Sequence, residues 1–150
     1  MIQTRLSPTL SSDAASLRWR EAFTATYLER DIQALGPRIP ATTLRRLWTM
    51  LAHNQGGLLN QSQLAASLAV SGQTVARYID LLADLMLVRR LPAWHGNVGK
   101  RLVRAAKVYV RDSGITHALL GLANLESVLA HPVAGTSWEG FVIDQLIASA

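Results

Sequence analysis

The chain has 150 residues, enough for one domain or for one small domain with helical attachments. Hydrophobic residues make up 49% and charged residues 17%, a composition that excludes an intrinsically disordered chain. The absence of cysteine excludes disulfides and thiolate metal sites, and no apolar run reaches the roughly 18 residues that a membrane span needs. Since the N-terminal residues also lack the apolar core of a signal peptide, we expect a cytoplasmic protein.

The net charge is +5, and the basic residues are thirteen arginines and two lysines. Arginine is the residue whose planar guanidinium forks onto phosphate or carboxylate oxygens. This balance favours nucleic acid or an acidic protein surface as the partner.

The first part of the chain predicts an arm and a helix. Residues 1–11 show no periodic pattern, so we expect a disordered arm. A long helix is predicted over 12–35, within an N-terminal helical segment that extends to residue 40. Ser12 or Asp13 can cap this helix, and aromatic side chains recur on one face at every fourth position: Trp19, Phe23 and Tyr27.

Residues 41–112 predict a winged helix-turn-helix. A helix over 41–53 comes first, and then two short helices within 61–83 meet across a turn near 69–72. Asn60 and Ser71 are placed to cap these two helices. The apolar side chains expected to bury together where the two helices cross are Leu64, Leu68, Val70, Val75 and Ile79.

Two strands, over 86–91 and 107–111, follow the helices and are joined by a glycine-containing loop. Three helices followed by a two-stranded ribbon give the order of a winged helix. The expected fold class is therefore mostly α with a small β-hairpin, a winged helix-turn-helix with flanking helices. Ala69 is an exception to this pattern, because it stands at a turn position where many helix-turn-helices have glycine, and alanine adopts fewer backbone conformations than glycine.

The second helix of the pair is the candidate recognition helix. Its first turns expose Gln73, Thr74 and Arg77, and glutamine and arginine make bidentate contacts to adenine and guanine edges. Basic side chains around the wing could neutralise phosphates: Arg89, Arg90, Lys100, Arg101, Arg104 and Lys107, with Arg111 beyond them. Asp80 and Asp84 would repel a phosphate backbone, so a protein-facing role for the same surface stays open.

Residues 113–150 predict a short helix over 115–120 and a last helix that begins near Thr136. Thr136 and Glu139 have the spacing of a capping box. The apolar face of the last helix comprises Trp138, Phe141, Val142 and Leu146.

Catalytic residues are not expected in this chain. Asp112 and Glu139 are weak candidates, and each is explained more simply as a helix-capping residue. Residues 96–101 suggest a phosphate loop, but the first glycine and the hydroxyl residue after the lysine are both missing. The four histidines are too scattered for a metal site, so we expect neither a cofactor nor a metal.

Several stretches give the sequence a resemblance to the DUF4143 family, found C-terminal to an AAA-type ATPase module in prokaryotic proteins. They are 27–32 (YLERDI), 64–78, 100–102, 107–114 (KVYVRDSG), 119–121 and 138–142 (WEGFV). The resemblance implies that residues 113–150 are the truncated start of an α/β region similar to restriction endonucleases. It also implies an ATP-binding parent protein of which this chain is a fragment. In nuclease-like folds a helix glutamate can help to hold a metal, and Glu139 stands where that helix would be.

Three functions remain open from the sequence. The leading hypothesis is a winged-helix nucleic-acid-binding or regulatory module of an ATPase-associated protein, not itself catalytic, with double-stranded DNA as the partner. The second is a protein-interaction domain that docks onto the AAA-type ATPase module or onto a second copy. The third is a remnant of a metal-dependent nuclease. No membrane partner is expected.

Overall fold

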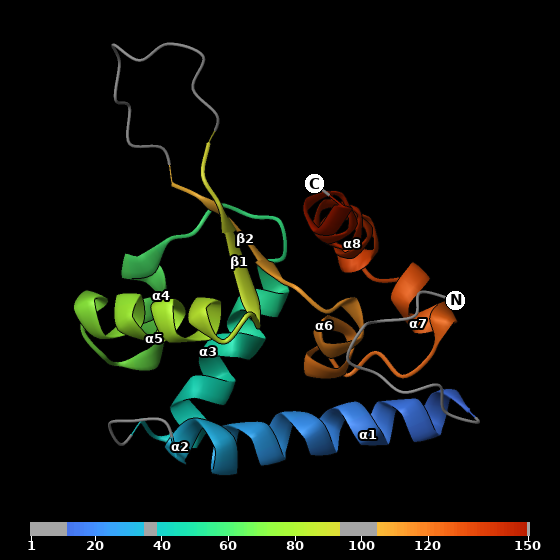
Figure 1. The fold of residues 1–150 in the computed structure, drawn as a ribbon, viewed down its shortest axis with the longest axis horizontal. Coiled ribbons are helices and arrows are strands. Elements are labelled where there is room, and N and C mark those ends of the chain that lie inside the picture. The colour runs from blue at the N-terminus through green and yellow to red at the C-terminus, as the bar shows by residue number, and fades with distance from the viewer. Residues whose placement is uncertain (1–11, 35–38, 94–104, 150) are drawn as a thin grey trace.

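The computed structural model describes residues 12–34, 39–93 and 105–149. They form a mostly helical structure with one two-stranded antiparallel sheet, which confirms this part of the expected fold class (Figure 1). The helices are α1 (Asp13–Thr26), the π-helix η1 (Tyr27–Asp31), α2 (Ile32–Ala34), α3 (Ala41–His53), α4 (Gln61–Leu68), α5 (Gly72–Asp84), α6 (Ser113–Leu119), α7 (Leu125–Leu129) and α8 (Val133–Ser149). The strands are β1 (Val88–Leu91) and β2 (Lys107–Val110).

The N-terminal helix runs from α1 through η1 into α2, so the long helix predicted over 12–35 is interrupted only by one π-helical turn. Of the two predicted capping residues, Ser12 is the cap, because its Oγ accepts a hydrogen bond of 3.2 Å from the backbone N–H of Ala15. The aromatic series is a stack: the ring centroids of Trp19 and Phe23 lie 5.4 Å apart, and those of Phe23 and Tyr27 also lie 5.4 Å apart. The predicted arm, residues 1–11, lies outside the described residues.

The core lies between α3, α5 and the hairpin. Trp48 on α3 and Val75 and Ile79 on α5 are fully buried. Of the side chains predicted to bury at the crossing of the two short helices, Leu64, Leu68, Val75 and Ile79 are buried and Val70 is partly buried against the core. Ala65 is also buried, and its small side chain lets α4 and α5 approach each other closely.

The turn between α4 and α5 has the predicted caps. Asn60 accepts a 3.1 Å hydrogen bond from the backbone N–H of Gln63, and Ser71 accepts one of the same length from Thr74. Ala69 ends α4 with φ 54° and ψ 42°, a left-handed conformation that a residue with a Cβ adopts only at a cost. The turn therefore forms without glycine.

The hairpin pairs β1 with β2 from Val88↔Val110 to Leu91↔Lys107. Leu58, just before α4, adds an isolated antiparallel bridge to Lys107 on the other side of β2. Figure 1 shows the hairpin standing between the α3–α5 group and the α6–α8 group, with α1 running along both groups. The order α3, α4, α5, β1, β2 is the order expected for a winged helix-turn-helix.

The C-terminal part differs from the prediction. Asp112 caps α6 as expected, because its Oδ1 accepts a 2.9 Å hydrogen bond from the backbone N–H of Ile115. However, α7 was missed, and α8 begins at Val133 instead of near Thr136. The proposed capping box from Thr136 to Glu139 is therefore wrong, since both residues lie inside α8.

The physical reason for the earlier start of α8 lies in residues 131–133. Pro132 directly precedes α8. Proline is suited to the start of a helix, because the backbone N–H that it lacks would have no acceptor within the helix there. The imidazole Nδ1 of His131 accepts a 3.1 Å hydrogen bond from the backbone N–H of Val133, which satisfies one of the free donors at the helix start. Among the described residues 113–149 the regular secondary structure consists of the helices α6, α7 and α8. The strands that an endonuclease-like region would add to a sheet are not found in that range.

None of the described helices is both long enough and apolar enough to cross a lipid bilayer.

Candidate nucleic-acid interface

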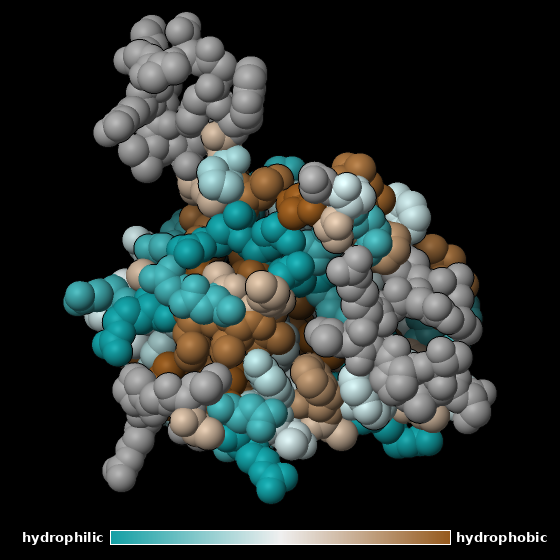
Figure 2. Space-filling view, in the orientation of Figure 1, coloured by the Kyte–Doolittle hydropathy of each residue, from teal (hydrophilic) through white to brown (hydrophobic). Residues whose placement is uncertain are grey.

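The first two turns of α5 bring the predicted recognition residues together. Gln73 and Arg77 are exposed and Thr74 is partly exposed, while Val75 and Ile79 on the opposite face are fully buried. The hydroxyl of Thr74 lies 2.8 Å from that of Ser71, so this side chain contributes to the start of the helix. Figure 2 shows hydrophilic side chains gathered at the left edge of the molecule, over the N-terminal end of α5.

Arg77 and Arg90 differ in whether their guanidinium groups form an ion pair within the protein. Among the described residues, no ion pair involves Arg77. Arg90 on β1 pairs with Asp80 on α5 at 2.7 Å, and both side chains are largely exposed. Asp80 therefore faces a guanidinium, which offsets the repulsion that its carboxylate would exert on a phosphate.

Arg89 lies on the opposite side of β1 and is turned toward α8. Its Nε donates to Oδ1 of Asp144 at 2.7 Å, and the Nε of Arg111 donates to Oδ2 of the same carboxylate at 3.1 Å. The side chain of Arg89 is only 21% exposed. This residue, expected at the phosphate surface, instead joins the hairpin to α8.

Lys107 is also paired. Its Nζ lies 3.2 Å from Oε1 of Glu139, and the hydroxyl of Tyr109 donates to the same oxygen at 3.0 Å. The hydrogen bond that Lys107 donates to Glu139 raises the pKa of Lys107, and burial together with that carboxylate raises the pKa of Tyr109. Lys107 thus stays protonated and about half exposed. The remaining wing candidates, Lys100, Arg101 and Arg104, lie outside the described residues.

The weak catalytic candidates have structural partners. Asp112 caps α6, and Glu139 accepts hydrogen bonds from Lys107 and Tyr109. Within the part of the chain that the structure describes, no three His, Asp or Glu side chains gather as metal ligands. The geometry around Glu139 thus offers no support for a nuclease remnant.

One polar pair was not found by sequence reasoning. The Nε2 of His117 on α6 lies 2.9 Å from the Oγ of Ser137 on α8, and Ser137 is buried. Burial, with smaller contributions from the charges of Arg20 and His131, lowers the pKa of His117 to about 4. The imidazole is therefore neutral at pH 7 and links the two helices. Because the two residues lie 20 positions apart, no local pattern indicates the contact.

Comparison with known proteins gives two curated relatives. They are the uncharacterized proteins Rv2008c of Mycobacterium tuberculosis and Mb2031c of Mycobacterium bovis, each 48% identical over 140 residues. The match covers 93% of this chain and 32% of each relative, so the chain spans about a third of the length of these proteins.

Two solved structures resemble the chain loosely. The first is MepR, a transcription regulator of the Staphylococcus aureus multidrug efflux pump MepA, with 15% identity and a TM-score of 0.39. It covers 89% of this chain and 95% of its own. The second is the transcriptional regulator PA3341, with 21% identity, a TM-score of 0.36, and coverage of 90% and 95%. Scores this low establish no shared fold or function.

The family comparison corrects the resemblance drawn from the sequence. The family model that matches residues 8–126 is not that of DUF4143, so the assignment to that family is wrong. The ATPase-associated parent and the endonuclease-like C-terminal region were implied by that assignment and lose their support with it. The short stretches that suggested it, such as 107–114, contain a strand and a helix start that form part of this fold. The chain belongs to the family described as "Domain of unknown function (DUF8612)".

Proposed function

We propose that residues 41–112 form a winged helix-turn-helix that binds double-stranded DNA, with α5 as the recognition helix. The observation that carries the proposal is the two-sidedness of α5, which buries Val75 and Ile79 completely and exposes Gln73 and Arg77. Glutamine and arginine side chains at the start of a recognition helix are suited to base edges in the major groove. The segments 12–40 and 113–150 are then the flanking parts that support this unit.

Phosphate contacts come from the basic side chains nearest to α5 and the wing. Arg90 lies beside α5 through its pair with Asp80, and Lys107 is about half exposed at the start of β2. We include Lys100, Arg101 and Arg104, which the chain places between β1 and β2. Arg89 is the weakest member of the predicted set, because its guanidinium is engaged with Asp144 away from α5.

The test is the affinity for a fluorescently labelled duplex pool of random sequence, measured by anisotropy at several salt concentrations. Binding driven by phosphate contacts weakens linearly with the logarithm of salt, with a slope of about −0.9 for each contact. We expect Arg77→Ala to weaken binding roughly tenfold, which is on the order of one base or phosphate contact.

The matched control removes the same charge elsewhere. Arg18→Ala changes an exposed arginine on α1, away from α5, and should leave the affinity nearly unchanged. Equal losses of DNA affinity in the two variants would show that the affinity depends on the net charge of the protein and not on the position of Arg77. An absence of binding at low salt would remove the proposal.

A protein-interaction role is the second candidate, and the exposed apolar side chains of α7 and α8 favour it. They are Leu125, Leu129, Trp138, Leu146 and Ile147. In this role the chain would self-associate without binding the duplex pool. Sedimentation of the free protein, run beside the anisotropy measurement, separates the two functions.

A further inference from the structure

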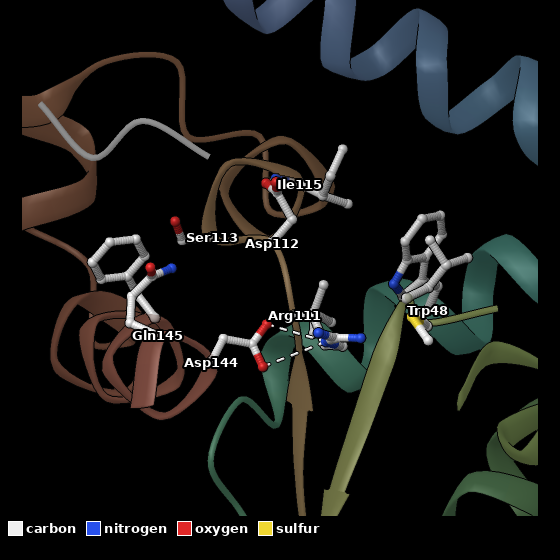
Figure 3. A pocket seen from close by; sticks show the side chains of 11 residues that line it. Trp48, Arg111, Asp112, Ser113, Ile115, Asp144 and Gln145 are labelled. Carbon is white, nitrogen blue, oxygen red and sulfur yellow. Dashed lines mark hydrogen bonds and ion pairs between the residues drawn. The ribbon is translucent and has the colours of Figure 1, made fainter. Parts of the chain in front are cut away.

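The side of the hairpin that faces α8 carries basic side chains, and carboxylates of α8 are bound to them. Asp144 accepts hydrogen bonds from the Nε of Arg89 at 2.7 Å and from the Nε of Arg111 at 3.1 Å. Figure 3 shows Asp144 pointing from α8 toward Arg111. Earlier on α8, Glu139 accepts a hydrogen bond from the Nζ of Lys107 at 3.2 Å. One helix therefore holds three basic side chains of the wing.

The charges of the chain are divided between two parts of the sequence. Residues 112–150 contain four carboxylates and no lysine or arginine, whereas all fifteen lysines and arginines lie in residues 1–111. A guanidinium group binds carboxylate and phosphate oxygens with the same planar set of donors. The carboxylate of Asp144 thus occupies donors that a DNA phosphate would otherwise use.

Both faces of a two-stranded ribbon can meet phosphates. Successive side chains of a strand point to opposite faces, and on β1 Arg90 pairs with Asp80 of α5 while Arg89 pairs with Asp144 of α8. A ribbon that enters a groove of DNA lies between the two phosphate backbones. A duplex at α5 meets Arg90 directly, but it reaches Arg89 only if α8 releases it.

The packing of α8 is uneven along its length. Its buried residues all lie in the first half of the helix: Val133, Ser137 and Gly140. None of residues 141–149, all of which the structure describes, is buried. A cavity of about 200 Å³ lies between this second half and the core, with Trp48 and Ile115 in its wall. Because a void leaves the atoms that line it without packing partners, the second half depends on the ion pairs of Asp144 for its position.

We propose that α8 is an autoinhibitory helix, in which the carboxylate of Asp144 competes with DNA phosphates for Arg89 and Arg111. The inference rests on the proposed DNA binding and adds to it a second phosphate surface that α8 controls. Ion pairs that are partly open to solvent contribute little net stability, because desolvation and side-chain ordering offset their attraction. A duplex bound at α5 therefore displaces the second half of α8 and takes over the two arginines.

The first test is the affinity of Asp144→Asn for the labelled duplex pool, measured by anisotropy at several salt concentrations. The variant keeps the shape of the side chain but no longer holds the two guanidinium groups by charge. We expect binding to tighten roughly tenfold at low salt, and the slope against the logarithm of salt to steepen by about 0.9 for each arginine that gains a phosphate.

The matched control is Glu126→Gln, which removes the same charge from an exposed position on α7. It should leave the salt slope unchanged, because it frees no basic side chain. If Asp144→Asn changes the affinity and the slope no more than this control does, the inference is wrong and the proposed function stands. If neither the original chain nor Asp144→Asn binds the duplex at low salt, both fail.

The second test needs no substitution, so it decides the question even if Asp144→Asn does not fold. Hydrogen exchange of the original chain is followed by mass spectrometry with and without saturating duplex. A ligand that binds only the released state shifts the population toward that state. We expect the amides of residues 137–145 to exchange faster with the duplex, while those of α5 exchange more slowly. Exchange in residues 137–145 that is unchanged or slower with the duplex would overturn the proposal.

Discussion

Several charged residues of this chain form ion pairs with residues that lie far away in the sequence. Arg89 and Asp144 are 55 positions apart, and Lys107 and Glu139 are 32 positions apart. The sequence placed Arg89 and Lys107 on the two predicted strands of the wing, but whether such a charge meets solvent or a carboxylate depends on how α8 packs on the hairpin. For this reason the predicted phosphate contacts include two residues, Arg89 and Arg111, whose guanidinium groups the structure directs to Asp144.

His117 supplies a prediction at the residue scale. Its pKa is lowered to about 4 in the folded protein, whereas an unfolded chain has an ordinary histidine value near 6.5. Between these values the unfolded state binds a proton that the folded state does not, so stability falls as the pH falls from 6.5 toward 4. Above pH 6.5 the imidazole is neutral in both the folded and the unfolded state, so His117 does not make the stability depend on pH.

The measurement is the free energy of unfolding in urea at pH 7 and at pH 4.5. Since the imidazole is partly exposed, we expect a contribution on the order of 2 kcal/mol rather than the full value of the shift. His117→Gln keeps a polar group near Ser137 but does not titrate, so it should lose less stability over this range than the original chain. An equal loss in both proteins would contradict the lowered pKa.

At the scale of elements, the sequence predicted those helices whose ends carry local signals. The bounds of α3 match the prediction, and Asn60 and Ser71 cap α4 and α5 as expected. The start of α8 was misplaced because its cap is a histidine, which is not a usual capping residue. The missed helix α7 did have a signal, since Asn124 and Ser127 form a capping box.

Ala69 supplies the prediction at this scale. Its left-handed conformation costs about 1 kcal/mol relative to glycine, which has no Cβ to clash with the backbone. We therefore expect Ala69→Gly to raise the free energy of unfolding by about 1 kcal/mol in a urea titration.

The control for this substitution is Ala66→Gly, an exposed alanine inside α4. There glycine should lower the stability by about 1 kcal/mol, because an ordinary helical position favours alanine. A decrease in stability for Ala69→Gly as well would show that the turn between α4 and α5 is not left-handed at this residue.

At the scale of the whole molecule, the hairpin has a different environment on each side. On one side lie α4 and α5 with the exposed residues Gln73 and Arg77, and on the other lies α8, held by Asp144 through two arginines. The relatives are about three times as long as this chain. The helices α7 and α8, which carry exposed apolar side chains, lie on the side of the hairpin away from α5. A DNA duplex at α5 would leave that side uncovered.

The central claim is that α5 faces the duplex, and a cross-link from its first turn tests this most directly. Since the chain has no cysteine, Gln73→Cys gives a unique site for a photoactivatable cross-linker, and Ala14→Cys gives a matched exposed site on α1. With both variants bound to the same labelled duplex, we expect cross-links to DNA from position 73 and few from position 14. Equal yields from the two positions, or a higher yield from position 14, would contradict the account.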